Sequence, residues 1–396
     1  MTSTRRPSSS TRAAKGRRSP KSPTRTRRPA DGSRNSEWLV VLPVMLLCLL
    51  GVVMVYSASS AGAVAAGAAS WSVAVKQVGY LVVGTAVALF VARAPLPFLR
   101  DKVAVAAYVV AVGALMVVLV PGNPFAVSVN GATRWLGVGP LQFQPSELAK
   151  PALVLWLARY LDVHQGRDWD IYKLRPVLVG FGLLAGLVLL GDDMGTTALL
   201  SLVMLTMIYM AGAPGRKVAG LGGLGALVAV SFLLLGDGFR MRRLMAFLHP
   251  DDYKLSEAWQ LHQSQIGLAS GGLFGSGPGY SRAKWGYLGP EAHTDFILAV
   301  IGEELGLFGT LVVIACVVTI MWGGARITLG AKDQFGRLVA VGVTAWIGFQ
   351  ALINIGVTIG TLPTKGITLP FVSYGGSSLI VSLLGVGLLL AVARDR

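Results

Sequence analysis

The stretch WLVVLPVMLLCLLGVVMVYS, residues 38–57, sets the class of fold because it contains no charged side chain. A helix needs about 20 apolar residues to cross the hydrocarbon core of a bilayer. Similar stretches recur along the chain and predict ten spans: residues 38–57, 73–93, 103–121, 147–163, 177–191, 196–212, 217–235, 294–322, 337–360 and 376–393. We therefore expect an all-α integral membrane protein with ten transmembrane helices.

The composition excludes a soluble fold. Of 396 residues, 53% are hydrophobic and 14% are charged, against roughly 45–50% and 25% in soluble domains. The net charge of +16 would suit nucleic-acid binding, but residues 1–37 hold eleven Lys or Arg and two acidic residues, which leaves +7 for the rest. No nucleic-acid partner is expected. Cys48 and Cys316 lie in apolar stretches, so neither a disulfide framework nor a thiol metal site is predicted.

Residues 1–37 are predicted to form a disordered, basic, cytoplasmic tail, because they have too few apolar side chains to offset the entropy of ordering. Such positive charge holds the first span with its N-terminus inside, and docking of a cytoplasmic partner is the alternative role. The tail is not a cleavable signal peptide, since the following apolar stretch has spanning length. The short Lys- and Arg-rich connections and the C-terminus then lie in the cytoplasm.

The longest connection, residues 236–293, is predicted to be a large extracytoplasmic loop between helices 7 and 8. Loops of this length are usually functional. Its polar stretch at 259–266 suggests an interfacial helix. The glycines at 271–279 predict either a flexible turn or a functional backbone site.

Motifs for two common kinds of active site are absent. The sequence has no G-x-x-x-x-G-K-[ST], which excludes P-loop nucleotide hydrolysis. Its four histidines are scattered and form no H-E-x-x-H, so no resident metal site is predicted.

An ionisable residue at membrane depth is costly and marks function by default. Asp295, in PEAHTDF at 290–296, is expected in the first turn of the 294–322 helix. Position alone allows two roles: the carboxylate could cap that helix N-terminus, or it could be catalytic.

Four further acidic residues are interpreted as structural. Glu303 and Glu304 lie about 12–13 Å further along the same helix at 1.5 Å per residue. They are too deep for surface chemistry, so we expect them to pair with a polar group on another helix. Asp192 and Asp193, in a tight link between two short spans, have the same interpretation.

Two more polar clusters are expected on the outer face. Arg134 and Trp135 offer a phosphate-binding fork beside a ring that could stack on a sugar; an interfacial anchor is the alternative. Residues 361–378 contain two prolines and several glycines, which predicts a broken segment that only protein or water can bury at membrane depth. Lys365, within it, is a candidate buried cation. These groups together suit an anionic, lipid-linked ligand.

The sequence resembles the SEDS (FtsW/RodA/SpoVE) family of bacterial wall polymerases over nearly the whole chain after residue 37. The resemblance is carried by the following motifs: NGATRW and QPSELAK at 130–150, GDDMGTT at 191–197, QLHQSQIGLASGGLFGSGPG at 260–279, PEAHTDFILAVIGEELG at 290–306 and NIGVTIGTLPTKGITLPFVSYGGSS at 354–378. The PEAHTDF spelling and the long tail favour the division member.

The resemblance implies a peptidoglycan glycosyltransferase that joins lipid II into glycan strands, with Asp295 as the family's essential aspartate. The 4-hydroxyl of one sugar would attack the anomeric carbon of another chain with inversion, and the undecaprenyl pyrophosphate would leave. Asp295 would take the proton, and Arg134 and Lys365 would stabilise the leaving group. Residues assigned to substrate binding are Arg134, Trp135, Lys365, Ser373, Ser377, Glu291 and His293.

The resemblance also implies a place and partners. These are the bacterial cytoplasmic membrane at the division septum, a class B penicillin-binding protein that crosslinks the strands, and other divisome proteins. No cofactor is required by the sequence, although a transient divalent cation (Mg²⁺ or Mn²⁺) would suit a pyrophosphate leaving group. A lipid II flippase and a noncatalytic scaffold are the alternative functions.

Overall fold

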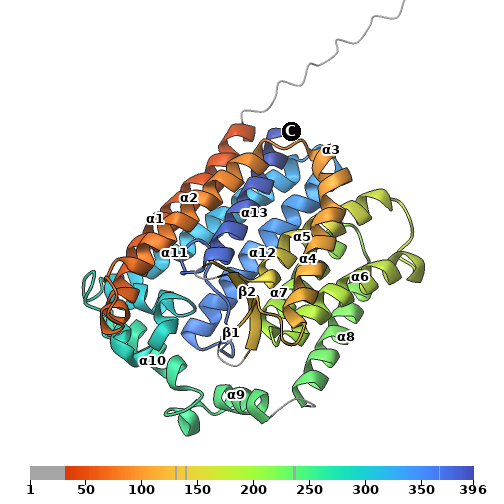
Figure 1. Cartoon of the computed structure of the whole chain (residues 1–396). Coiled ribbons are helices and arrows are strands. Elements are labelled where there is room, and N and C mark those ends of the chain that lie inside the picture. Colours follow the sequence, from red (N-terminus) through yellow and green to blue (C-terminus); the bar gives the residue numbers. More distant parts are fainter. Residues whose placement is uncertain (1–31, 130–131, 139–140, 235–237, 365) are drawn as a thin grey trace, which may run out of the picture. The chain divides into compact units, whose positions relative to one another are not determined.

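The computed structural model describes residues 32–129, 132–138, 141–234, 238–364 and 366–396, and these are mostly helical (Figure 1). The helices are α1 Gly32–Ala65, α2 Ser72–Ala92, α3 Leu96–Phe98, α4 Ala104–Leu119, α5 Pro145–Val163, α6 Ile171–Leu190, α7 Met194–Met210, α8 Gly215–Leu234, α9 Gly238–Leu248, α10 Trp259–Ser270, α11 Ile297–Gly330, α12 Gln334–Ile359 and α13 Gly376–Arg394. Shorter helical turns are η1 Leu99–Val103, η2 Pro250–Tyr253, η3 Ala283–Tyr287 and η4 Gly289–His293.

The membrane class of the fold is confirmed. Each predicted span falls largely on one helix, and eight helices in the described part of the chain are long and apolar enough to cross a membrane. The apolar helix α7 has only 17 residues, and α5 carries four charged residues, Glu147, Lys150, Arg159 and Asp162. The number of ten spans therefore stays a prediction.

The predicted tail lies mostly outside the described residues. Its last part, residues 32–37, is already helical as the start of α1. The boundary predicted at residue 37 is thus too late by about two turns of helix, because polar residues can precede the apolar part of a membrane helix.

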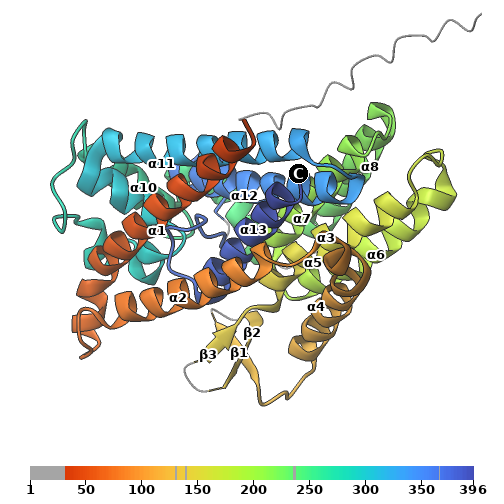
Figure 2. The ribbon, with the colours of Figure 1, turned by 90° about the horizontal axis from the view of Figure 1, so that it is seen from above.

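Helices α12 and α13 form the centre of the described unit. About three quarters of their most apolar stretches are buried, whereas α8 has no buried residue. Trp346 of α12 is fully buried. Helix α13 packs against α2, and α1 packs against α2 and α11, as Figures 1 and 2 show.

A small antiparallel sheet departs from the all-α prediction. It consists of β1 Ala126–Val129, β2 Ala132–Val138 and β3 Leu141–Phe143 in that order, and it lies beyond the end of α4 (Figure 2). Asn-Gly between two short runs with β-branched residues is a strong hairpin signal, and Asn130-Gly131 has that context in the sequence. We interpreted those residues only as part of a binding motif.

Helix α11 is interrupted at Gly306, where φ is +67° and ψ is −165°. The interruption frees backbone groups, and the glycine-rich stretch supplies partners: the N–H groups of Ser276 and Gly277 donate to the carbonyl oxygens of Glu303 and Glu304 at 2.9 and 3.1 Å. A side chain at Gly275 would lie 2.1 Å from the Glu304 carbonyl oxygen. The glycines therefore permit close contact between the loop backbone and α11. The sequence analysis considered a flexible turn or a functional backbone site, but not this packing role.

Glu303 and Glu304 are buried beside the same loop. Glu304 Oε1 accepts from Ser57 Oγ of α1 at 2.6 Å and lies 3.3 Å from Lys284 Nζ. Glu303 Oε2 accepts from Ser281 Oγ at 2.5 Å. The partners are thus mainly loop groups, with one neighbouring helix, and they pin residues 276–284 against α11.

Candidate functional site

Asp295 lies at the end of the bundle that holds the sheet and α9–α10, between η4 and α11. Helix α11 begins at Ile297 with Phe296 as its N-cap residue, so Asp295 precedes the first turn instead of lying in it. No side-chain hydrogen bond caps α11. The helix therefore begins three residues after the predicted start at residue 294, and the Asp295 carboxylate makes no capping hydrogen bond to it.

Burial and neighbouring charge both act on the Asp295 carboxyl group. Its surface is still partly accessible, but the protein around it displaces bulk water. This desolvation raises the pKa of Asp295, and the negative charges of Glu291 and Asp193 raise it further. Arg243 has the opposite effect, and the resulting pKa is about 7. A carboxyl group with such a pKa can accept a proton near neutral pH.

The broken segment between α12 and α13 packs against the residues around Asp295. Asn354 Nδ2 donates to the carbonyl oxygens of Asp295 and Ile367 at 2.7 and 2.8 Å. A Cβ at Gly366 would lie 3.5 Å from Asp295 Oδ2. Lys365, predicted as a cation here, lies outside the described residues.

Ser373 and Ser377 have partners within the protein. Ser373 Oγ donates to the Thr294 carbonyl oxygen at 2.6 Å and accepts from the Leu369 N–H at 2.8 Å. Ser377 Oγ accepts from the Gln144 N–H at 3.1 Å. Both serines are buried. In this structure their hydroxyl groups hold backbone segments together, and their assignment to substrate binding stays a prediction.

Arg134 also has partners within the protein, and its predicted role in phosphate binding stays a prediction. It lies on β2, and its Nε and Nη2 groups donate to the carbonyl oxygens of Gly191 and Asp192, both at 2.7 Å. Two donors on one edge of the guanidinium group therefore bind the α6–α7 link. Trp135, which pairs with Val127 of β1, is partly exposed.

Asp193 is the N-cap residue of α7. Its Oδ1 atom accepts from the Thr196 N–H at 2.9 Å, and its Oδ2 atom accepts from Ser146 Oγ and Gln144 Nε2 at 3.0 and 3.2 Å. Asp192 has φ of +64°, which is uncommon for a residue with a side chain. Both aspartates thus shape the turn that Arg134 holds.

Glu291 and His293 belong to η4, directly before Asp295. The carbonyl oxygen of Glu291 accepts from the Phe296 N–H at 3.1 Å. The His293 ring lies 5.4 Å from that of Tyr374, and burial lowers the pKa of His293. Imidazole is therefore neutral at physiological pH, which favours hydrogen bonding over charge.

The sequence reasoning missed Arg243, an exposed residue of α9 whose charge acts on Asp295 and Glu291. The signal was available, because residues 240–243 read RMRR in an outer connection that should be poor in Lys and Arg. We applied that rule only to the short loops.

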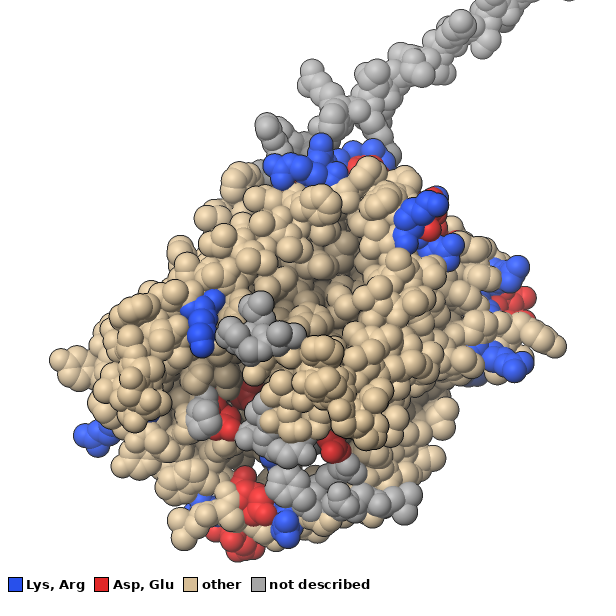
Figure 3. Space-filling view, in the orientation of Figure 1, with Lys and Arg blue, Asp and Glu red and all other residues tan. Residues whose placement is uncertain are grey.

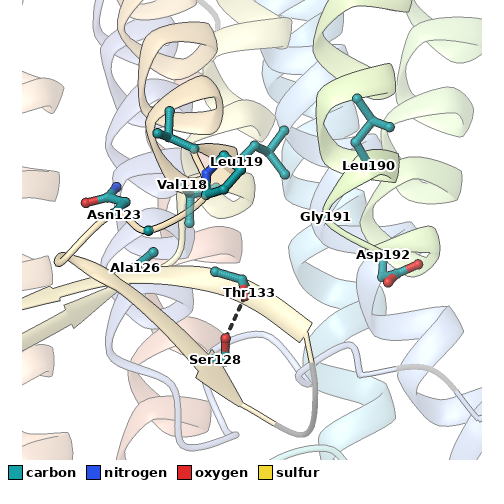
Figure 4. A pocket seen from close by; sticks show the side chains of 12 residues that line it. Val118, Leu119, Asn123, Ala126, Ser128, Thr133, Leu190, Gly191 and Asp192 are labelled. Atoms are coloured by element: carbon teal, nitrogen blue, oxygen red, sulfur yellow. Dashed lines mark hydrogen bonds between the residues drawn. The ribbon is translucent and has the colours of Figure 1, made fainter.

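A pocket of about 370 Å³ opens next to the α6–α7 link. It is lined by the ends of α4 and α6 and by the hairpin, with Ser128 and Thr133 hydrogen-bonded to each other at 2.6 Å (Figure 4). Among the described residues, no three His, Cys, Asp or Glu side chains converge as metal ligands.

Charged side chains gather at the two ends of the bundle on the face shown in Figure 3. One group extends from the C-terminus past α3 to the right-hand edge of the view, the other lies near α9 and α10, and the area between them carries only scattered charged side chains. This pattern suits a membrane belt that leaves the Asp295 end in a polar phase.

Comparisons with known proteins agree with this architecture. The FtsW/RodA/SpoVE family model, described as "Cell cycle protein", matches residues 37–396. A probable peptidoglycan glycosyltransferase FtsW from Geobacter sp. (strain M18) is 37% identical over 364 residues, covering 90% of this chain and 96% of the relative. Its counterpart from Coxiella burnetii is 36% identical over 367 residues, with coverages of 90% and 96%.

Two solved structures are also similar. A chain from a peptidoglycan synthase complex, in a structure concerned with the coordination of polymerization and crosslinking, has a TM-score of 0.73 and 28% identity, covering 91% of this chain and 98% of that one. The Thermus thermophilus rod shape determining protein RodA has a TM-score of 0.67 and 29% identity, with coverages of 91% and 97%.

Proposed function

This chain belongs to the FtsW/RodA/SpoVE family of cell cycle proteins, and we propose from that premise how it polymerises lipid II. It is a multi-pass membrane protein and a peptidoglycan glycosyltransferase, as its relatives' names indicate. The reaction joins lipid-linked disaccharides into glycan strands during septal wall synthesis.

The observation that carries the mechanism is the environment of Asp295. A carboxyl group partly open to solvent, with a pKa raised to about 7, is suited to general base catalysis at neutral pH. Asp295 accepts the proton of the attacking sugar 4-hydroxyl as its oxygen bonds to the anomeric carbon of the other chain. The bond from that carbon to the pyrophosphate breaks with inversion.

The leaving pyrophosphate takes the electron pair and needs fixed positive charge, because a phosphate leaving group requires no protonating acid. Arg243 lies within electrostatic range of Asp295, and Lys365 adjoins Gly366 in the sequence. We assign these two cations to the pyrophosphate. Arg134 contributes chiefly by holding the α6–α7 link. A transient divalent ion carried by the substrate would add charge in the same place.

The partners and location follow from the same family. The structural neighbour belongs to a complex that couples polymerization and crosslinking, which supports a crosslinking transpeptidase as partner. We assign this partner to the class B penicillin-binding proteins. We place the Asp295 end outside the cytoplasmic membrane and both termini in the cytoplasm, at the division septum.

The test is polymerisation of labelled lipid II by the protein with its cognate transpeptidase. Asp295→Asn keeps the size of the side chain but removes the base, so we expect loss of polymer with an intact complex. Full activity of Asp295→Asn would overturn the assignment of the base. Absence of polymer from the wild type with the transpeptidase, with and without Mg²⁺ or Mn²⁺, would favour a flippase or scaffold instead.

A further inference from the structure

We infer that Asn354 is a positioning residue that fixes the Asp295 backbone against the broken segment between α12 and α13. The inference rests on the proposed function, because it gives Asp295 the role of the base. Asn354 itself touches no reacting atom in this account. It acts through the backbone of the residue that does.

The contacts of Asn354 join three separate parts of the chain. The side chain projects from α12 and is only 1% exposed. Its Nδ2 group donates to the carbonyl oxygen of Asp295 at 2.7 Å and to that of Ile367 at 2.8 Å. Both amide hydrogens are therefore committed, one to each side of the site. A rigid helix thus sets the separation of two irregular segments.

The chemistry of the side chain suits this role and few others. An amide NH₂ group carries two donors, whereas an ionised carboxylate carries none and a hydroxyl carries one. The opposite amide orientation would place Oδ1 against two carbonyl oxygens, so the contacts themselves assign the NH₂ group. Among the described residues, Asn354 Oδ1 is then buried without a hydrogen-bond partner. A buried acceptor without a partner is unfavourable, which would select against asparagine unless its two donors were needed.

The clamp that Asn354 forms between the backbones of Asp295 and Ile367 also limits the surroundings of the Asp295 carboxylate. Ile367 follows Gly366, whose Cβ position lies 3.5 Å from Asp295 Oδ2. Fixing Ile367 relative to the Asp295 backbone therefore fixes how closely the segment approaches the carboxylate. The other charged groups that face Asp295 are Glu291 of η4, Asp193 before α7 and Arg243 of α9.

The chain offers a matched control in Gln77 of α2. Its buried side-chain amide, also 1% exposed, donates from Nε2 to the carbonyl oxygen of Ser373 at 3.2 Å. Its Oε1 atom likewise has no hydrogen-bond partner in the described part of the chain. Gln77 therefore tethers the same segment without contacting Asp295. Asn354→Leu and Gln77→Leu each replace a buried amide by an apolar side chain of similar size.

The experiment uses the full chain with its transpeptidase and two readouts. The first is the kcat and KM of lipid II polymerisation for wild type, Asn354→Leu, Asn354→Ala and Gln77→Leu, normalised to folded complex. The second is the pH dependence of carbodiimide and glycinamide labelling of Asp295, followed by mass spectrometry of its peptide. Labelling measures the protonation of Asp295 without requiring any activity.

For both Asn354 variants we expect kcat to fall about 10- to 100-fold with little change in KM, since small misplacements of reacting groups cost that much. We also expect the labelling midpoint to move to lower pH as water reaches the released carboxylate. Gln77→Leu should keep the wild-type midpoint and lose less kcat. The positioning role would be overturned if the folded Asn354 variants kept the wild-type labelling midpoint and kcat. It would also be overturned if Gln77→Leu changed both quantities as much as the Asn354 variants do.

Failure of Asp295 as the base and failure of Asn354 as a positioning residue give different results. If Asp295→Asn polymerises lipid II normally, the proposed base is wrong, yet the labelling midpoints still test whether Asn354 positions Asp295. If Asp295→Asn is inactive and the Asn354 variants match wild type in both readouts, only the clamp is wrong. If one Asn354 variant fails to fold, the other supplies both measurements. If both Asn354 variants fail to fold while Gln77→Leu folds, Asn354 is required for folding, and the positioning role is overturned.

Discussion

The Nη2 group of Arg134 donates to the carbonyl oxygen of Asp192 at 2.7 Å, which ties the β hairpin to the turn between α6 and α7. Asp192 has φ of +64°, a conformation that persists only where the surrounding structure enforces it. The neighbouring Asp193 caps α7 and contributes to the field at Asp295. Arg134, which the sequence suggests for phosphate binding, thus also holds the turn that carries Asp193.

This geometry predicts that Arg134→Lys is not a conservative change. Lysine keeps the charge but cannot reproduce two hydrogen bonds in the fixed fork of a guanidinium group. We expect a lower melting temperature, equivalent to about 1–3 kcal/mol, and reduced polymerisation. Thermal unfolding in detergent and a lipid II assay measure both. Retention of full stability and activity by Arg134→Lys would show that only the positive charge is needed.

The raised pKa of Asp295 predicts a dependence of polymerisation on pH. The base must be deprotonated, so kcat should increase as pH rises through about 7 and level off above it. Initial rates of polymer formation between pH 5.5 and 8.5, in about half-unit steps, give the profile. A rate that is already maximal at pH 5.5 would place the pKa in the ordinary range and contradict the environment described for Asp295.

The same shift predicts a pH-dependent effect of Asp295→Asn on stability. A carboxyl group whose pKa is higher in the folded than in the unfolded state destabilises the fold once it ionises. The cost is absent below about pH 4 and complete above about 7. Asp295→Asn should therefore melt at a higher temperature than wild type at pH 8, with the difference disappearing toward pH 4. An unchanged or lower melting temperature at pH 8 would oppose this.

The sequence was sufficient to locate the helices and to single out Asp295 as a candidate, because both depend on local signals. Apolar length locates the spans, and an acidic residue beside a span stands out. It was insufficient for Glu304, whose partner Ser57 lies 247 residues away, since a single sequence does not show which distant elements pack together. The break in α11 at Gly306 could not be predicted either, because this glycine occurs within an apolar stretch.

Some features were not predicted although the sequence contains a signal for them. Gln350 and Asn354 lie one turn apart in the apolar stretch 337–360, and a neutral amide at membrane depth also needs a partner. We considered only ionisable residues there. The Asn130-Gly131 pair and the arginines at 240–243 are further cases in which a general rule, applied more widely, would have indicated the hairpin and Arg243.

The buried pair of Glu304 and Lys284 predicts strong coupling between two substitutions. Their side chains are 0% and 4% exposed and 3.3 Å apart. Glu304→Gln leaves a buried ammonium group with less compensation, which typically costs about 3–5 kcal/mol. The double variant Glu304→Gln/Lys284→Met removes both charges and should recover part of that loss. Thermal unfolding of the wild type, Glu304→Gln, Lys284→Met and the double variant gives the coupling energy. Additive losses of stability would contradict a direct interaction.

The last prediction concerns the space between Gly366 and Asp295. A methyl group at Gly366 would lie 3.5 Å from Asp295 Oδ2, in ordinary van der Waals contact, and the backbone there has no positive φ. Gly366→Ala should thus fold normally but occupy the room that an approaching sugar hydroxyl requires. We expect kcat to fall about tenfold with an unchanged melting temperature. Gly113→Ala, where the added methyl meets nothing within 4 Å, serves as the control and should polymerise lipid II at the wild-type rate. Equal activity of Gly366→Ala and Gly113→Ala would mean that the reacting hydroxyl approaches Asp295 from another direction.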